Sequence, residues 1–188
     1  MNYIVFEGID GSGKSTVSKM FLQYLLNKGY SVLYTKEPYT SDIDVLIRKN
    51  QTNKTLLFLF LADRSIHIEK LKKQHVDFIV SDRSFYSTIC YQGYGGGIDV
   101  EFVTKLNEFV VEDFLPNTVF YLDCTPEVAL SRIKKLDAIE HKHLTFFQKV
   151  REGYLDLAKK HNFITINAQG NLQEVFSNTV EYYETRFS

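Results

Sequence analysis

The sequence predicts an α/β fold with three layers, α/β/α, around a five-stranded parallel sheet. Short apolar runs alternate along the chain with longer stretches in which apolar residues recur at helical spacing. This alternation is typical of a parallel sheet covered by helices on both faces. A chain of 188 residues with 44% hydrophobic residues is expected to form a single domain, residues 1–188, with one core. The strands are predicted at 3–6, 31–35, 77–81, 118–122 and 163–166.

Helices are predicted between these strands. The run Leu56–Leu61 is ambiguous between strand and helix, and its amphipathic continuation through Leu71 favours a helix. Residues 134–143 are polar and break the periodicity, so we expect a short lid there. The first helix follows a glycine-rich loop and ends near Gly29, and the others are predicted at 42–50, 53–74, the stretch up to Tyr91, 99–115, 126–135, 144–161 and 172–187.

Composition and charge narrow the class of protein. The net charge of −1 and the pI of 6.5 argue against a general nucleic-acid binder, which usually carries a basic excess. Met1-Asn2-Tyr3 leads directly into a predicted strand, so we expect no signal peptide, and the longest wholly apolar run is too short to cross a bilayer. Cys90 and Cys124 make no disulfide framework. We expect buried, reduced thiols in a cytoplasmic protein, with a disulfide or a reactive thiol as the alternative.

Residues Gly8–Ser15 match the phosphate-loop pattern G-x-x-x-x-G-K-[ST], between a predicted strand and a predicted helix. Glycines let successive backbone N–H groups converge on an anion, and the start of the helix adds its positive end. Lys14 would meet the β- and γ-phosphates, and Ser15 would offer a hydroxyl to Mg²⁺. A chance glycine-rich turn is the alternative, and the flanking strand and helix argue against it.

Charged residues follow several of the predicted strands. Ligands of such sheets bind beyond the carboxyl ends of the strands, so we expect Gly8–Ser15, Glu37, Asp82-Arg83 and Asp123 to share one site. A carboxylate at position 82 can hold Mg²⁺ through water, and an arginine at position 83 can hold a second phosphate. A surface turn or a structural ion pair is the alternative for Asp82-Arg83.

Three arginines have open assignments from the residues alone. Phe60 and Arg64 are four residues apart on one helix face and suit a nucleobase, by stacking and hydrogen bonding. A core phenylalanine with a solvated arginine is the simpler interpretation, and Arg48 is also most simply a solvated helix residue. Near the lid, positive charge could stabilise a transferred phosphoryl group while the lid excludes water, although a solvated face is the alternative. The basic residues there are Arg132, Lys134, Lys135 and Lys142.

Several blocks of the sequence resemble thymidylate kinases. The segment 6–16 resembles the opening of that family, and Thr35-Lys-Glu-Pro38 is close to its T-R-E-P. Residues 56–64 resemble its substrate helix, and 82–93 resemble its D-R-[YHS]-x-x-S-x-x-A-Y-Q-G stretch. The segments 121–130 and 146–155 match later blocks in the right order. The resemblance spans essentially the whole chain, and the 82–93 block is its most specific part.

The resemblance implies a P-loop NTPase fold, transfer of the γ-phosphoryl of Mg-ATP to dTMP, and a homodimer without a nucleic-acid or membrane partner. It implies ATP binding by Gly8, Ile9, Asp10, Gly11, Ser12, Gly13, Lys14, Ser15, Thr16, Arg132 and Ala168. It implies acceptor binding by Asp10, Glu37, Arg48, Phe60, Arg64, Arg83, Ser87, Tyr91 and Gln92. Mg²⁺ would lie at Ser15 and Asp82, and the catalytic residues would be Asp10, Lys14, Arg83, Arg132 and Lys135.

The sequence also departs from the family pattern. The phosphate loop has no arginine, and Ala138 stands where a lid arginine is usual in L-D-R-I-E. Our hypothesis is that Arg132 or Lys135 supplies that charge. Tyr94 and Gly96 replace the second G and the R of Y-Q-G-G-G-R, which leaves the acceptor preference open. A deoxynucleoside kinase and a nucleotide-binding protein with weak turnover are the alternatives, whereas a GTPase would need an N-K-x-D element that the chain lacks.

Overall fold

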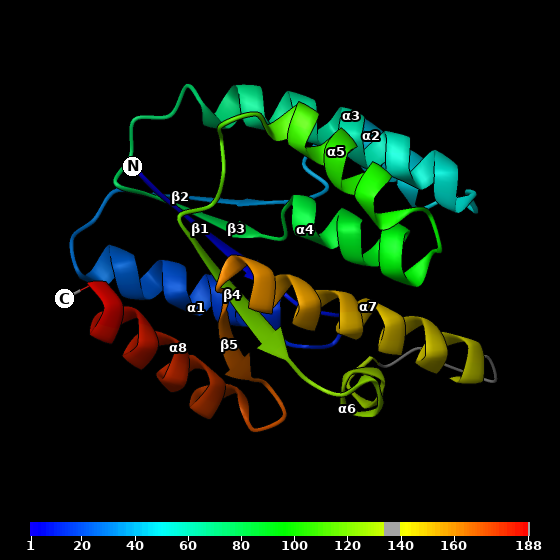
Figure 1. The fold of residues 1–188 in the computed structure, drawn as a ribbon. Helices are drawn as coiled ribbons and strands as arrows, with labels where there is room; N and C mark the ends of the chain where they lie inside the picture. The colour runs from blue at the N-terminus through cyan, green and yellow to red at the C-terminus, as the bar shows by residue number, and fades with distance from the viewer. Residues whose placement is uncertain (134–139, 188) are drawn as a thin grey trace.

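A parallel sheet of five strands forms the centre of the molecule, in the order β2-β3-β1-β4-β5 (Figure 1). The computed structural model describes residues 1–133 and 140–187, except for the side chains of 140–143 and 187. The sheet confirms the predicted fold class, and every strand lies within one residue of its predicted bounds. The strands are β1 (Asn2–Glu7), β2 (Val32–Lys36), β3 (Phe78–Asp82), β4 (Thr118–Asp123) and β5 (Ile164–Asn167).

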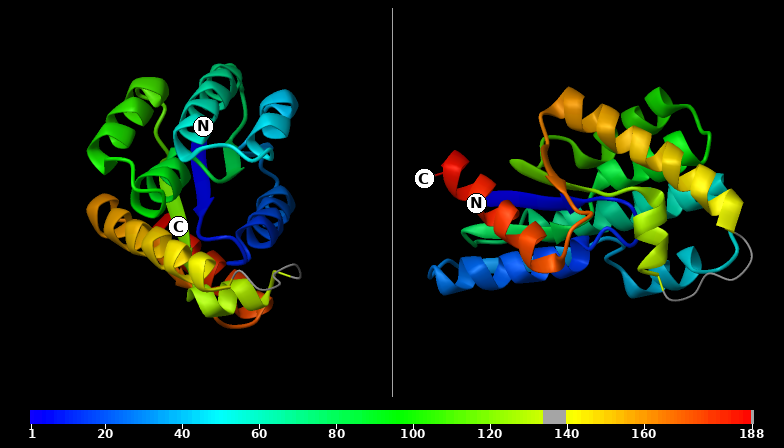
Figure 2. Two further views of the ribbon diagram at one scale, coloured as in Figure 1. Left: turned by 90° about the vertical axis from the view of Figure 1, so that its right-hand side faces the viewer. Right: turned by 90° about the horizontal axis from the view of Figure 1, so that it is seen from below.

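Helices cover both faces of the sheet (Figures 1 and 2). One face carries α1 (Lys14–Asn27) and α8 (Leu172–Phe187), which pack against each other. The other face carries α3 (Asn53–Leu71), α4 (Phe85–Thr88), the π-helix η1 (Ile89–Gly95), α5 (Val100–Val111) and α7 (Glu140–His161). The short helices α2 (Ser41–Ile47) and α6 (Pro126–Ser131) lie against α3 and α7 respectively.

The structure corrects several helix bounds and part of the expected lid. The helices predicted at 42–50, 53–74 and 99–115 end earlier, at Ile47, Leu71 and Val111. The stretch up to Tyr91 is divided into α4 and the wider turn of η1, which continues to Gly95. The helix predicted at 126–135 ends at Ser131, where Arg132 and Ile133 close the end with tighter i→i+3 bonds to Ala129 and Leu130. Residues 140–143 of the expected lid belong to α7, and its residues 134–139 lie outside the described part of the chain.

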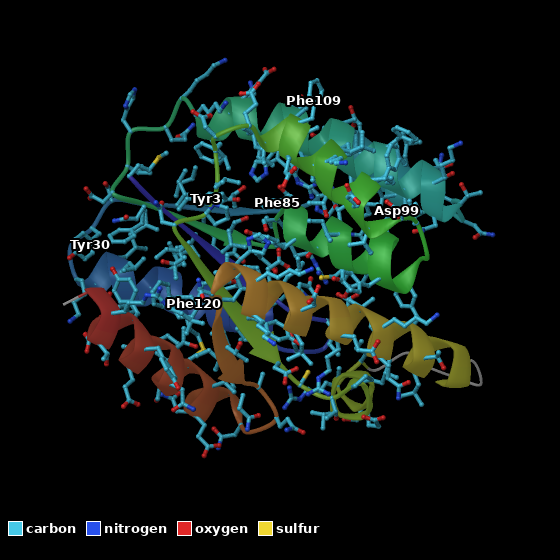
Figure 3. The ribbon with its side chains drawn as sticks, in the orientation of Figure 1. Tyr3, Tyr30, Phe85, Asp99, Phe109 and Phe120 are labelled. Carbon is cyan, nitrogen blue, oxygen red and sulfur yellow. The ribbon has the colours of Figure 1, made fainter. Side chains whose placement is uncertain are left out.

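The core lies on both sides of the sheet. The strands read as continuous apolar runs because both of their faces are covered, and Tyr3 and Phe120 lie between the layers (Figure 3). Phe109, in contrast, projects from the outer side of α5. Cys90 and Cys124 are buried and free, as expected. The rigid core therefore places the loops that follow the strands at one edge of the sheet.

Candidate active site

The loops after β1, β2 and β3 meet at the carboxyl edge of the sheet. Phe6 and Lys36 are both in register with Asp82, so the ends of the three strands are level. The Arg83 N–H donates to the Phe6 carbonyl at 3.0 Å, and the Glu37 N–H donates to the Asp82 carbonyl at the same distance. The glycine loop, Glu37 and Asp82-Arg83 therefore lie together, as the topology rule predicts.

The glycine loop has the backbone of an anion site. Gly13 caps α1 with φ 91°, in the left-handed region that favours glycine. A β-carbon on Gly11 would lie 2.1 Å from the carbonyl oxygen of Ala129, so this glycine allows the loop to approach α6. Lys14 is buried behind the loop, and its Nζ lies 3.4 Å from Asp10 Oδ1. Burial and the nearby Arg83 lower the pKa of Lys14 to about 8, so a bound phosphate would favour its charged form.

Ser15 and Asp82 offer oxygens suited to a divalent cation. The Ser15 hydroxyl donates to Asp82 Oδ2, while Asp82 Oδ1 is buried and has no hydrogen-bond partner in the described part of the chain. Within the described residues, no group of three or more His, Cys, Asp or Glu could hold a metal. Mg²⁺ typically takes one or two protein ligands together with waters and phosphate oxygens. The unpaired carboxylate oxygen and the adjacent hydroxyl therefore fit Mg²⁺.

Arg83 connects the glycine loop to the rest of the site. Its backbone has φ 78°, a strained conformation for a residue other than glycine, at the turn after β3. Its guanidinium donates to Ser87 Oγ at 2.8 Å, to Asp10 Oδ1 at 2.5 Å and to the Tyr91 hydroxyl at 3.3 Å. Burial raises the pKa of Asp10, but Arg83 and Lys14 outweigh this effect and lower it to about 2. Arg83 is therefore held in place while facing a carboxylate that is ionised at neutral pH.

Glu7, which the sequence analysis did not single out, holds the side chains that bind Arg83. It is fully buried at the end of β1. Its carboxylate accepts bonds from the Ser84 hydroxyl at 2.8 Å, the Ser87 hydroxyl at 2.6 Å and the Tyr154 hydroxyl at 2.8 Å. Ser87 and Tyr154 also accept bonds from Arg83. A carboxylate ending an otherwise apolar strand was the signal in the sequence that could have revealed it.

A cavity of about 480 Å³ opens beside Arg83. Its walls come from the loop that follows β2, from α2, α3 and η1, and from the N-terminal part of α7. Eight of the nine acceptor residues implied by the resemblance line it, namely Asp10, Glu37, Phe60, Arg64, Arg83, Ser87, Tyr91 and Gln92. The wall also includes Asn53, Thr88 and Phe146, which the sequence analysis did not assign to a site.

Arg64 is buried in the wall of this cavity, so the solvated arginine favoured by the residues alone is wrong. Its side chain is 2% exposed, and its Nη2 and Nε donate to Glu37 Oε2 at 2.5 and 3.0 Å. Nη1 donates to Asn107 Oδ1 at 2.6 Å, and Nη2 also reaches the Thr88 hydroxyl. Burial raises the pKa of Glu37, but Arg64 and His67 outweigh this and lower it to about 2. One N–H of Nη1 has no partner among the described residues.

Gln92 of η1 adds an unpaired acceptor to the residues that line the cavity. Gln92 Oε1 is buried and has no hydrogen-bond partner among the described residues. Next to it, the Tyr91 hydroxyl donates to Asp10 Oδ2 at 3.1 Å and accepts from the Asp10 N–H at 3.0 Å. The half-buried Phe60 adds an aromatic ring from α3. The cavity therefore combines an N–H donor, an unpaired amide oxygen and an aromatic face.

Two of the predicted site residues, Arg48 and Asp123, have partners elsewhere and do not line the cavity. Arg48 is exposed at the end of α2, where its Nε donates to Asp44 Oδ2 at 2.8 Å, and it does not line the cavity. Asp123 lies at the carboxyl end of β4, where it accepts two bonds from Arg151, at 2.7 and 2.9 Å. Arg151, on α7, was not identified from the sequence. Lys135 lies outside the described residues.

Arg132 and Ala168 lie together on the other side of the glycine loop. Arg132 donates to the carbonyl of Ala168 at 2.9 Å and to that of Gly170 at 3.1 Å. Both residues line a cavity of about 260 Å³ that also includes Ser12 and Gly13 of the loop. The shared assignment of Arg132 and Ala168 to one region beside the loop agrees with this geometry, whereas a role of Arg132 in phosphoryl transfer stays a prediction.

Comparisons with known proteins identify the family of this chain. The thymidylate kinase family model matches residues 6–179, which is most of the chain. The chain belongs to the thymidylate kinase family. It is 38% identical over 182 residues to a probable thymidylate kinase of Sulfurisphaera tokodaii, covering 95% of this chain and 94% of that protein. It is 40% identical over 186 residues to a probable thymidylate kinase of Metallosphaera sedula, covering 96% and 91%.

A solved structure of this family has the same fold. The crystal structure of thymidylate kinase from Ehrlichia chaffeensis superposes with a TM-score of 0.78 at 29% identity, covering 97% of this chain and 98% of that one. The family assignment and the three-layer P-loop fold are thus confirmed together. In the described part of the chain, none of the helices combines the length and the apolar content required to span a bilayer.

Proposed function

We propose that this protein transfers the γ-phosphoryl of Mg-ATP to dTMP, giving ADP and dTDP. The observation that carries the proposal is Arg83, which lies between the glycine loop and the 480 Å³ cavity and bonds to residues of both. A donor nucleotide on the loop and an acceptor nucleotide in the cavity would bring their phosphates together at this guanidinium. The family membership supports the same reaction.

The donor side would hold ATP through the glycine loop. Backbone N–H groups of 8–16 and Lys14 would bind the β- and γ-phosphates, and Arg132 and Ala168 would border the adenine. Ser15 and Asp82 would hold Mg²⁺, which neutralises phosphate charge when it is bound. The unpaired Asp82 Oδ1 is the group on this chain that supports the assignment.

The acceptor side suits a thymine base. Phe60 would stack on the ring, the remaining Nη1 N–H of Arg64 would donate to O4, and Gln92 Oε1 would accept from N3–H. Cytosine presents an amino donor at position 4 and an acceptor at N3, so both contacts would be mismatched. The ring of Tyr91 would lie against the deoxyribose, and Arg83 and Ser87 would hold the acceptor phosphate. Arg48 would reach that phosphate only after leaving Asp44.

The chain's own residues would act by positioning and electrostatics. The acceptor phosphate is already an anion, so no residue need act as a strong general base. Asp10, ionised because its pKa is about 2, would keep Arg83 oriented between the two phosphates. Our hypothesis is that Arg132 or Lys135 adds charge at the transferred phosphoryl. If Lys135 has this role, Lys135→Ala should lower kcat, whereas an unchanged kcat would remove Lys135 from the role and leave Arg132.

The test is ADP release from Mg-ATP with dTMP, dUMP, the ribonucleotide TMP, dCMP and thymidine, each supplied alone. We expect the highest kcat/KM with dTMP and little turnover with dCMP. Turnover with thymidine alone would move the chain to the deoxynucleoside kinases. ATP binding without turnover on any acceptor would favour a nucleotide-binding role and refute the proposed reaction.

We also propose a cytoplasmic homodimer that associates through α3 and α5. These helices expose large apolar side chains on the outer surface of the molecule: Phe58, Ile66, Phe102 and Phe109. Phe109 is 82% exposed on α5 (Figure 3). Phe102 lies seven residues earlier, two helical turns away, and so on the same side of that helix. A second copy of the chain would remove this surface from water.

A further inference from the structure

Gly96 is a glycine for reasons of space. Its backbone, with φ −88° and ψ −6°, lies in a region open to any residue, so the conformation does not require glycine. A β-carbon at this position would lie 2.0 Å from Nδ2 and 2.5 Å from Cγ of Asn53. The family pattern quoted above has arginine at this position, and here the amide of Asn53 occupies the space instead.

Asn53 joins two walls of the acceptor cavity. It is the first residue of α3, and its Nδ2 donates to the Gln92 carbonyl at 3.0 Å and to the Gly96 carbonyl at 2.9 Å. Both N–H groups of the amide are therefore used to hold the end of η1. Helix α3 carries Phe60 and Arg64, whereas η1 carries Tyr91 and Gln92, so this one amide connects the two halves of the base site.

The hydrogen bond from Asn53 restrains the backbone of Gln92, a residue that lines the cavity. Gln92 is the middle residue of η1, and its carbonyl accepts hydrogen bonds from Asn53 Nδ2 and, at 3.2 Å, from the Ile98 N–H. Gln92 Oε1, in contrast, is buried without a partner among the residues that the structure describes, and Gln92 lines the cavity. Asn53 therefore restrains the backbone of Gln92 without engaging its side-chain oxygen.

We propose that Asn53 is a positioning residue that holds Gln92 at a set distance from Phe60 and Arg64, and thereby determines which pyrimidine the acceptor cavity selects. The proposal rests on the proposed function, because it assigns a role in reading the base of the acceptor. It requires both an asparagine at 53 and the absence of a side chain at 96. Loss of the Asn53 hydrogen bonds should therefore weaken dTMP binding more than it slows phosphoryl transfer.

The first test is a comparison of Asn53→Ala, Gly96→Ala and the double variant, with Lys54→Ala, at the next and exposed position of α3, as the control. Gly96→Ala should displace the flexible Asn53 amide and imitate its removal. In both single variants we expect the KM for dTMP to rise about five- to tenfold with kcat within about twofold, the loss of one or two neutral hydrogen bonds. The double variant should match the single variants, because only one contact exists to be lost.

The second readout is acceptor selectivity. The ratio of kcat/KM for dTMP over dCMP should fall about fivefold or more in Asn53→Ala and stay unchanged in Lys54→Ala. A purely structural role would lower stability without changing this ratio and would overturn the proposal. Additive effects of the two single substitutions would overturn it as well.

A third measurement separates this inference from the proposed function. Thermal unfolding without nucleotide needs no activity: Gly96→Ala should lower Tm in the native background and leave it unchanged when Asn53 is already alanine. An equal loss in both backgrounds would refute the contact itself. A native chain that shows this Tm pattern but neither binds nor phosphorylates dTMP would refute the proposed function and, with it, the assignment of Asn53 to base selection.

Discussion

Removal of the charge of Glu37 is the sharpest test of the buried part of the site. Glu37→Gln keeps the size of the side chain but leaves the Arg64 guanidinium, 2% exposed, without its counter-ion. Breaking one side of a buried ion pair typically costs about 3–5 kcal/mol of the free energy of unfolding. A chain of this length should then lose roughly 6–20 °C in Tm.

The pH dependence gives the same prediction an independent magnitude. The pKa of Glu37 is lowered from 4.5 to about 2 in the folded protein, so its contribution to stability is complete above pH 4.5 and is lost as the pH falls towards 2. A shift of this size corresponds to about 3 kcal/mol at neutral pH. The stability gap between the native chain and Glu37→Gln should be constant from pH 7 to 5 and shrink by about 2 kcal/mol at pH 3.

The assay is urea unfolding at pH 7, 5 and 3, with Glu101→Gln as the control. Glu101 carries an exposed ion pair with Lys105, four residues away, so its substitution should change stability little. Combining Glu37→Gln with Arg64→Met should recover part of the lost stability, because the unpaired buried charge is removed. A loss below about 1 kcal/mol at pH 7, or a gap that does not shrink in acid, would refute this account of the pair.

The remaining predictions concern the phosphates, the metal and the dimer. Arg83→Ala should lower kcat/KM by at least about a hundredfold while the far-ultraviolet circular dichroism stays unchanged, and near-normal kinetics would remove it from the phosphate site. Asp82→Asn should raise the Mg²⁺ concentration needed for half-maximal activity severalfold with little change in the KM for dTMP, and an unchanged Mg²⁺ requirement would exclude this ligand. Phe109→Asp should convert a dimer to a monomer in sedimentation, and the assignment of α5 to the interface fails if the mass does not change.

Glu37 and Arg64 also show why part of the site was hidden in the sequence. Phe60 and Arg64 were recognisable as helix neighbours, but a solvated arginine was the simpler interpretation. The burial of Arg64 depends on Glu37, in the loop that follows β2, and on Asn107 of α5. Both partners are distant from Arg64 in the sequence. Local spacing cannot report such distant partners, so the residues alone ranked the two interpretations in the wrong order.

The sequence by itself determined the succession of strands and helices along the chain and the position of the glycine loop. It also determined the edge of the sheet at which charged residues gather. Those features follow from local rules, namely apolar periodicity, the small size of glycine and the direction of parallel strands. Only the tertiary structure decided that Asp123 forms an ion pair with Arg151 and that Arg48 forms one with Asp44. It also decided that the Asn53 side chain fills the space beside Gly96. These outcomes depend on which side chains meet across separate elements, and contact between distant residues is set by packing rather than by spacing along the chain.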